Sequence, residues 1–437
     1  MILRQAPWRN WSRTESVRPV RVERPASVGA VQRSVLAAGR SGLRIKAVGT
    51  GHSFTGIAVA PGVQLDLLDL GGLIDVDAET ARVRVAAGLP LHRLSRLLDT
   101  HGLALTNLGD IDRQTVAGAI STGTHGTGGR FLGLASQVTA LTLVTADGGL
   151  LRVSETENAE LLPAVRLGLG ALGIIVDVTL QCVPRFMLRS EQKSEPLAAV
   201  LEDYLSRSQA SDHFEFFWFP HTRTALTKTN TRLAERPPGA RSARSSRWVD
   251  DELLANGIYR GVCAAGTALP ALVPPLARLS ARATGNRQFT DASARVFATN
   301  RAVRFREMEY ALPREHVPEA VLEVQRLIEA QGWRISFPIE VRSAAADDLW
   351  LSAAYGRETG YISVHRYARE DPEEYFRAVE QIMIGFGGRP HWGKLHYQDA
   401  DALRGRYPHF DDFLAVRDRL DPERRFTNSY LERVLGP

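Results

Sequence analysis

The chain has 437 residues, of which 44% are hydrophobic and 24% are charged, a composition typical of a globular protein with room for two domains. No run of about 18 apolar residues occurs, so no transmembrane helix is predicted, and the N-terminal stretch lacks the apolar core of a signal peptide. Its two cysteines, Cys182 and Cys263, are too few for a disulfide framework. We therefore expect reduced thiols and a cytoplasmic protein, with peripheral attachment to a membrane left open.

The net charge of +5 does not by itself predict a nucleic-acid partner. Arginine supplies nearly all of the 54 basic residues, and 49 acidic residues offset them. The densest basic run, RLAERPPGARSARSSR (232–247), is rich in proline, glycine and serine, which is typical of a loop. We expect no binding to nucleic acid and interpret this run as a loop over a site in the second domain.

The first 184 residues alternate short strands with helices. Pro90 suits the first turn of a helix, leucines form its apolar stripe, and Gly102 suits its end. Asp147 to Gly149 reads as the turn of a hairpin. The predicted elements are strands in RIKAVGTG (44–51), GVQLDLLDL (62–70) and ARVRVAAG (81–88), the helix at 89–102, the hairpin at 134–154, and a buried strand at 171–184.

The middle of the chain combines aromatic-rich strands with amphipathic helices. This pattern predicts an antiparallel sheet with helices on one face, in a domain of its own. The tail after residue 390 is polar and helical. The predicted strands are HFEFFWFP (213–220), RAVRFREMEYALP (301–313), WRISFPIEVRSA (333–344) and GYISVHRYA (360–368), and the predicted helices are residues 318–332 and 372–387.

Two of these strands carry ionisable side chains on one face. Because side chains alternate along a strand, Glu340 and Arg342 share a face, with Ile339 and Val341 on the other. In the predicted strand 360–368, His365 likewise points to the face opposite that of Val364. Two such strands would build a polar site above an apolar core. A solvated outer face with a surface ion pair stays open as the alternative, and the proline at 338 suggests an edge strand or a bulge.

Two glycine-rich stretches point to a large cofactor. VGTGHSFTGIAV (48–59) lacks the third glycine and the following helix of a dinucleotide fingerprint, and it misses the hydrolase motif by one residue. NLGDIDRQTVAGAISTGTHGTGG (107–129) lets the backbone approach a flat or anionic ligand. Unrelated turns are the alternative. No metal site is expected, because His391 and His396 are five apart and no HExxH motif occurs.

At this point a family resemblance becomes specific. VGTGHSF, QTVAGAISTGTHGTG, GALGIIVDVTL and the late RPHWGK occur in order along the whole chain. Together they resemble the aldonolactone oxidoreductases and alditol oxidases, flavoenzymes of the vanillyl-alcohol-oxidase type. The resemblance is strongest to L-gulono-1,4-lactone dehydrogenases and D-arabinono-1,4-lactone oxidases of actinobacteria. It implies an α+β fold with an FAD-binding domain (1–184), a substrate-binding cap domain with an antiparallel sheet flanked by helices (185–390), and a C-terminal segment (391–437) that returns to the FAD domain and the site.

The resemblance also implies that FAD is covalently bound. In this family the histidine of GxGHS is joined to the 8α-methyl carbon of the flavin, and His52 is the matching residue. Gly109 matches the position beside the reactive edge, where a side chain hinders dioxygen, although relatives with glycine are also described as dehydrogenases. The residues implied in cofactor binding are Val48, Gly49, Thr50, Gly51, His52, Ser53, Gly109, Asp110, Thr115, Gly118, Ser121, Thr122, Gly123, Thr124, His125, Gly126, Gly173, Ile174, His391 and Lys394.

The implied reaction is hydride transfer from the C2 carbon of an aldonolactone to the flavin, with dioxygen or another molecule as the final electron acceptor. Arg342 and Lys394 would supply positive charge, Glu340 would orient the substrate, and His365 would accept a proton or a hydrogen bond. Thr115 would also contact the substrate, since relatives have a serine near the substrate there. His365 replaces a threonine of the alditol oxidases, a departure that favours ring lactones over open-chain polyols. A polyol oxidase on the same fold is the alternative.

Overall fold

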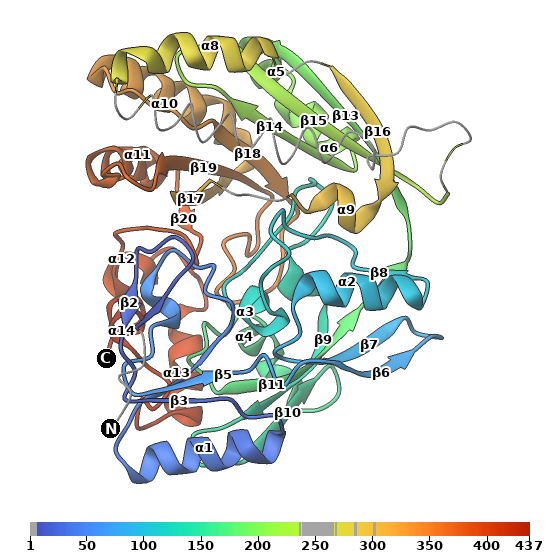
Figure 1. The fold of residues 1–437 in the computed structure, drawn as a ribbon, viewed down its shortest axis with the longest axis vertical. Coiled ribbons are helices and arrows are strands. Elements are labelled where there is room, and N and C mark those ends of the chain that lie inside the picture. Colours follow the sequence, from blue (N-terminus) through green and yellow to red (C-terminus); the bar gives the residue numbers. More distant parts are fainter. Residues whose placement is uncertain (1–6, 236, 238–265, 267–268, 284–285, 300–302) are drawn as a thin grey trace.

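The computed structural model describes residues 7–235, 237, 266, 269–283, 286–299 and 303–437. Two lobes lie one above the other in Figure 1, and both chain termini belong to the lower lobe. Within the described residues, no helix has the length and apolar character needed to cross a membrane. Of the basic run at 232–247, the structure describes only residues 232–235 and 237, so the predicted loop itself lies outside the described residues.

The lower lobe begins with a small parallel sheet that positions the first glycine loop. Ser27 caps the covering helix by accepting a hydrogen bond from the amide of Ala30, and valines of that helix pack inward. The strand β4 ends at Val48, so the chain turns directly into the glycine loop. The order of the sheet is β3-β5-β4. The elements are β3 (Arg21–Glu23), α1 (Val28–Arg40), β4 (Ile45–Val48) and β5 (Val63–Asp66).

A five-stranded antiparallel sheet forms the rest of this lobe, in the order β10-β9-β11-β7-β6. Its central strands are buried on both faces, which explains their nearly continuous apolar sequence. The elements are β6 (Leu73–Asp77), β7 (Arg82–Ala86), α2 (Leu91–Thr100), α3 (Val116–Ser121), β9 (Val138–Val144), β10 (Leu150–Ser154) and β11 (Ile174–Gln181). Short elements are β1 (Trp8–Arg9), β2 (Ser16–Val17), β8 (Leu103–Ala104), α4 (Leu162–Val165) and β12 (Val183–Pro184).

The upper lobe contains an eight-stranded sheet in the order β16-β13-β15-β14-β18-β19-β17-β20. All neighbouring strands are antiparallel, as the sequence predicted. The strands are β13 (Met187–Pro196), β14 (His213–Trp218), β15 (Thr224–Leu233), β16 (Arg287–Ala292), β17 (Phe305–Pro313), β18 (Ile339–Ala344), β19 (Thr359–Tyr367) and β20 (Arg389–Pro390).

Helices cover one face of this sheet, and the other face turns toward the lower lobe (Figure 1). Ile339 and Val341 join the core beneath the helices, so Glu340 and Arg342 face the other way. The helices of this core are α5 (Leu197–Glu202), α6 (Tyr204–Ala210), α10 (Val317–Gln331) and α11 (Glu373–Gly385). The others are α8 (Val273–Ala283) and α9 (Ser293–Phe297), of which α9 packs into the core of the lower lobe.

The strand that carries Glu340 differs from its prediction in two respects. It begins at Ile339 rather than at residue 333, since Pro338 has no amide hydrogen for the ladder. It also pairs on both sides, with β14 and β19, so the suggestion of an edge strand is wrong. Phe337 accordingly leaves the core beneath the helices and joins a separate aromatic cluster with Phe305.

The C-terminal segment returns to the lower lobe. The side chain of Asn428 donates hydrogen bonds to the carbonyls of Gly56, Ile57 and Val59, just after the first glycine loop. Phe413 and other buried side chains of its helices belong to the lower core. This path brings residues 391–396 to the junction of the lobes. The helices are α12 (Ala400–Arg404), α13 (Phe410–Leu420) and α14 (Ser429–Leu435).

Candidate active site

Three cavities meet at His52. The glycine-loop cavity lies between the loop at 48–53, α3 and residues 169–175. The carboxylate cavity lies between the lobes and is lined by Arg342, Glu309 and Lys394 among others. The arginine cavity lies beside α2 and α9. Among the described residues, His52 alone lines all three, so it stands where the lower-lobe loop meets the polar face of the upper sheet.

The glycine-loop cavity is shaped by close backbone contacts. A Cβ atom at Gly49 would lie 2.6 Å from the hydroxyl of Thr115, which itself caps α3 by accepting from the amide of Gly118 at 3.2 Å. Gly51 has a φ of +70°, in the region that favours glycine. The predicted cofactor residues that line this cavity are Val48, Gly49, Thr50, Gly51, His52, Ser53, Thr115, Gly118, Ser121, Thr122, Gly173 and Ile174.

Three of the predicted glycines act through packing. A Cβ at Gly126 would lie 2.4 Å from the side-chain oxygen of Asn107 and 2.5 Å from the carbonyl of Leu108. At Gly109 it would lie 3.1 Å from the carbonyl of His125, a tight contact between the two ends of the stretch 107–129. Gly123 has a φ of +79° and, like Gly126, lines none of the three cavities.

A buried lysine closes the far side of the glycine-loop cavity. Lys46 donates hydrogen bonds to the carbonyls of Gly170 and Phe426, at 3.0 and 3.1 Å. Burial, with a smaller contribution from the nearby Arg417, lowers its pKa to about 7. The ammonium group therefore joins β4, the loop before β11 and the C-terminal segment at one point.

His52 is held as a neutral imidazole. Its Nδ1 atom lies 3.0 Å from the hydroxyl of Thr50, and the ring lies parallel to that of Trp11. Burial is the main cause that lowers its pKa to about 4, and the positive charge of Arg113 adds to the effect. A neutral ring keeps a lone pair on one nitrogen, which a bond from that nitrogen to a carbon atom requires.

In the carboxylate cavity, Arg342 is surrounded by acidic groups. It forms an ion pair with Glu340, its Nε donates to Glu215 at 3.1 Å, and its Nη2 lies 3.6 Å from Asp110. Burial alone would lower its pKa, but these carboxylates outweigh burial and raise the pKa well above the usual value. Lys228 pairs with Glu215 from behind at 2.9 Å. The guanidinium is therefore permanently charged and fixed in orientation.

Lys394 is the second cation of this cavity. It forms an ion pair with Glu307 on β17, and Glu307 also lies 3.5 Å from the Nε2 atom of His365. Burial opposes ionisation of Glu307, but Lys394 and His365 outweigh it and lower the pKa. The Nδ1 atom of His365 is 3.1 Å from the carbonyl of Pro338. His365 thus lies behind Glu307, and it does not line the cavity.

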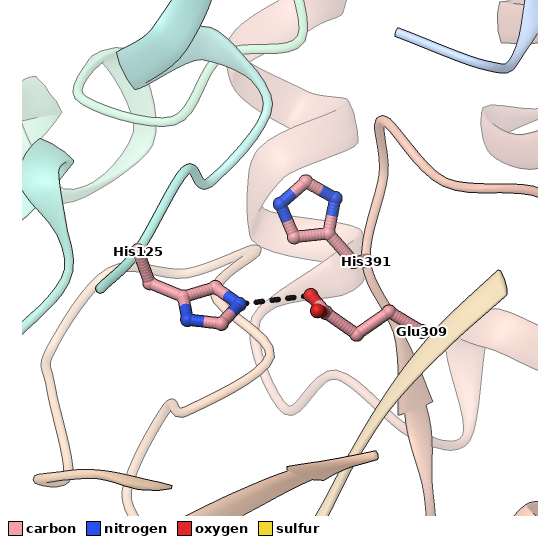
Figure 2. Close-up of side chains that lie close together, drawn as sticks. All are labelled: His125, Glu309 and His391. Carbon is pink, nitrogen blue, oxygen red and sulfur yellow. Dashed lines mark hydrogen bonds and ion pairs between the residues drawn. The ribbon is translucent and has the colours of Figure 1, made fainter. Parts of the chain in front are cut away.

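A third polar group joins both lobes (Figure 2). His125, from the second glycine loop, contacts Glu309 of β17 through a 2.8 Å hydrogen bond, and Ser363 bonds the other carboxylate oxygen. His391 lies above this pair in Figure 2. Its Nδ1 accepts from the amide of Gly393 at 3.0 Å, and burial lowers its pKa to about 4, so its single proton is assigned to Nε2.

The ligand atoms of these three residues lie within 4.8 Å of one another, a spacing that could hold a metal ion. However, both nitrogens of His125 are already engaged, with Glu309 and with the carbonyl of Gly126. The cations Arg342 and Lys394 line the same cavity and would repel a metal ion. We therefore interpret this group as a hydrogen-bonded pair that locks the loop to the sheet.

The structure brings most of the predicted site residues together. Thr115 is an exception, because its hydroxyl lies against Gly49 and Gly118 in the glycine-loop cavity and not beside Arg342. Glu340 and His365 support the cations from behind. The predicted residues that line the carboxylate cavity are His52, Ser53, Gly109, Asp110, Thr122, Thr124, His125, Arg342, His391 and Lys394.

Sequence reasoning missed three carboxylates, Glu215, Glu307 and Glu309. Glu215 is the only charged residue in the aromatic run FEFFW, and Glu307 and Glu309 alternate with Met308 and Tyr310 as Glu340 does with its neighbours. An isolated charge on the inner face of a strand was therefore the available signal. Asp110 was predicted to bind the cofactor, and the structure places its carboxylate beside Arg342.

These cavities fit the FAD that the resemblance implies. A Cβ at Gly49 would lie 2.6 Å from the hydroxyl of Thr115, so the backbone that lines the glycine-loop cavity is bare at this point, as a cradle for an extended ligand requires. The cavity of the glycine loops joins the carboxylate cavity at His52, Ser53, Gln114 and Thr122, so one ligand can occupy both. The neutral imidazole of His52 stands at that junction, and the two fixed cations line the carboxylate cavity.

Comparisons with known proteins agree with this architecture. Residues 19–154 match an FAD binding domain, and residues 178–434 match D-arabinono-1,4-lactone oxidase. The chain is 45% identical to L-gulono-1,4-lactone dehydrogenase of Mycobacterium tuberculosis, over 98% of this chain and 99% of that protein. It is 36% identical to mouse L-gulonolactone oxidase and 31% identical to an alditol oxidase of Streptomyces, each over 98% of both chains.

The fold also occurs in proteins that are less similar in sequence. The crystal structure of cholesterol oxidase from B. sterolicum superposes with a TM-score of 0.82, at 19% identity, over 99% of this chain and 96% of that one. Together with the match to an FAD binding domain, this likeness confirms the two-lobed fold of helices and antiparallel sheets that the sequence predicted. The chain belongs to the D-arabinono-1,4-lactone oxidase family and carries its FAD-binding domain.

Proposed function

We propose that this protein oxidises the C2 hydroxyl of an aldono-1,4-lactone, with covalently bound FAD as the immediate electron acceptor. The observation that carries the proposal is His52, which stands between the glycine-loop cavity and a cavity with the fixed cations Arg342 and Lys394. Relatives named as L-gulono-1,4-lactone dehydrogenase and L-gulonolactone oxidase support the substrate class.

Arg342 and Lys394 would bind the substrate oxygen that becomes negatively charged. Both side chains line the cavity and each is held by carboxylates behind it, so they need no rearrangement during the reaction. Such preorganised donors stabilise developing charge more strongly in the transition state than in the bound substrate. Glu340 and His365 act as positioning residues for these two cations.

The acidic groups of the cavity would orient the ring hydroxyls. Asp110 and Glu309 line the cavity and can accept hydrogen bonds from ring hydroxyls. Asp110 is the candidate acceptor for the proton of the C2 hydroxyl, because both oxygens of Glu309 are already bonded by His125 and Ser363. The Nε2 hydrogen of His391 would donate to a substrate oxygen. The cavity thus offers both donors and acceptors to the substrate, which suits a polyhydroxylated ring.

FAD, when bound, supplies the acceptor for the hydride that leaves C2. His52 would be joined to the flavin through the ring nitrogen that keeps its lone pair. Dioxygen or another molecule then takes the electrons. Gly109 does not decide between them, because its tight contact with the carbonyl of His125 is a second reason for a small residue there.

A polyol oxidase is the second candidate, and the 31% identical alditol oxidase supports it. The replacement of threonine by His365 cannot select lactones by direct contact, because His365 lies behind Glu307. The experiment is anaerobic bleaching of the bound flavin with L-gulono-1,4-lactone, D-arabinono-1,4-lactone and xylitol. We expect the lactones to bleach it at lower concentration, and bleaching by xylitol alone would favour the alternative.

A further inference from the structure

The arginine cavity has no part in the proposed oxidation of the lactone. It is lined by residues of α2 and α9, by residues between 103 and 113, and by Arg185 and Phe186. Among the described residues it shares only His52 and Ile111 with the carboxylate cavity. It therefore reaches the same imidazole by a separate route.

The arginine cavity combines buried or half-buried apolar side chains, here called its floor, with exposed arginines, here called its rim. Trp11, Leu108 and Phe186 contribute the apolar and aromatic surface of the floor. Four arginines line the cavity, against two aspartates, Asp99 and Asp112. The arginines are Arg96, Arg113, Arg185 and Arg295.

These arginines are exposed and weakly paired. Arg113 lies 3.7 Å from Asp112 with 62% of its side chain exposed, and Arg295 lies 3.5 Å from Asp291. Arg96 and Arg185 are exposed and form no ion pair with the described acidic residues. Exposed guanidinium groups around an apolar floor attract a planar organic anion, through charge at the rim and stacking below.

We propose that the arginine cavity binds the molecule that reoxidises the enzyme, a small planar organic anion of the quinone or indophenol class. The inference rests on the proposed function, because electrons can leave here only if the flavin is held at His52. Trp11, whose ring is stacked on His52 with centroids 6.2 Å apart, connects the floor of the cavity to that imidazole.

The electrons and protons of this reaction balance. Each lactone loses a hydride from C2 and a proton from its hydroxyl, a total of two electrons and two protons. The acceptor takes two electrons and two protons, so that a quinone becomes a hydroquinone and an indophenol becomes its colourless leuco form. The cofactor returns to its oxidised state.

The test uses the holoenzyme and the anion of dichlorophenolindophenol. In Arg96→Glu/Arg185→Glu, we expect the rate constant for reoxidation by this dye at low ionic strength to fall at least tenfold, within the range of electrostatic effects on association. The dissociation constant of the dye from oxidised enzyme, measured by calorimetry, should rise to a similar extent. Reoxidation by the cation phenazine methosulfate should not fall, and anaerobic reduction by the lactone should be unchanged.

The matched control is Arg223→Glu/Arg419→Glu, which changes the net charge equally at exposed positions outside all three cavities. Equal losses in both double variants, or no loss in either, would overturn the proposal. Slower reduction by the lactone in Arg96→Glu/Arg185→Glu would show instead that the cavity is the route for the lactone. If lactone fails to reduce the wild type, the proposed function fails, yet dye binding and reoxidation after dithionite reduction still test this cavity.

Discussion

At the scale of single residues, the position of His52 depends on the loop around it. Gly51 turns the backbone, Thr50 holds Nδ1 and Trp11 covers the ring, so the imidazole has one orientation. Burial keeps it neutral at physiological pH, since its pKa falls to about 4. These features suit a ring that forms a bond to the flavin.

His52→Ala should leave FAD bound but not covalently. After acid denaturation, the yellow colour should stay on the wild-type polypeptide and separate from the variant, as measured by absorbance of the precipitated protein. His92→Ala, a change in a histidine of α2 that lines only the arginine cavity, is the control and should keep the colour. Colour that washes off the wild type would contradict the covalent bond.

Arg342→Ala should slow anaerobic flavin reduction by the lactone well over tenfold, since loss of one such donor costs about 3 kcal/mol in the transition state. Arg342→Lys keeps the charge but cannot reach Glu340, Glu215 and Asp110 together. Its rate of flavin reduction should therefore lie between those of the wild type and Arg342→Ala. Stopped-flow absorbance checks both variants at equal flavin content. Wild-type rates in both would remove Arg342 from the mechanism.

Sequence alone predicted which side chains share a face of a strand, but not always how deep they lie. The alternation in ISFPIEVR predicted that Glu340 and Arg342 share a face, and they do. The same alternation could not tell that His365 lies behind Glu307, because that depends on pairing of β17 with β19. The family motif predicted that Thr115 contacts the substrate, but in the structure its hydroxyl caps α3.

At the scale of elements, the two ends of the second glycine-rich stretch (107–129) pack closely against each other. In this stretch Gly126 packs against Leu108, and the adjacent His125 forms a hydrogen bond to Glu309 of the upper sheet. One loop therefore lines the glycine-loop and carboxylate cavities and also joins the lobes. The spacing of glycines predicted a cradle, but the partner strand across the lobes was not visible in the sequence.

Gly126→Ala should destabilise the protein by about 1–3 kcal/mol, the usual cost of overpacking, because its Cβ would lie 2.5 Å from the carbonyl of Leu108. Flavin content after purification should fall with it. Gly72→Ala adds the same methyl group where no atom lies within 4 Å and is the control. Urea unfolding and the ratio of flavin to protein absorbance give the two readouts, and equal behaviour of both variants would contradict the packing argument.

At the scale of the whole molecule, buried histidines make the fold sensitive to acid. Burial lowers the pKa of His213 and His391 to about 4 and that of His396 to about 3. His213 bonds the carbonyl of Thr127 across the lobes, and His396 bonds Tyr430 of α14. Between pH 6.5 and 4 the unfolded chain binds more protons than the folded one, so the free energy of unfolding falls as pH falls.

His396→Gln should reduce this pH dependence. Each extra proton taken up on unfolding contributes about 1.4 kcal/mol per pH unit, and the variant removes one such group. Urea unfolding of the holoenzyme at pH 7 and pH 5 measures the difference, with the exposed His101→Gln as control. Identical pH dependence in His396→Gln and wild type would contradict the assignment.

The overall architecture was predictable because strand alternation, helix ends and the glycine loops are local properties. The junction of the lobes was not, because it is built from β14, β17 and β18 together with residues 391–394, which only the register brings side by side. The site therefore forms only when the two lobes are assembled. The central claim is that a lactone is oxidised at C2 where these lobes meet.

That claim is tested most directly by a single-turnover experiment with L-gulono-1,4-lactone that carries deuterium at C2. Mixed with the oxidised holoenzyme without oxygen, the unlabelled lactone should bleach the blue absorbance of the flavin, and the deuterated lactone should do so several-fold more slowly. Equal rates for the two lactones, or no bleaching by either, would contradict hydride transfer from C2.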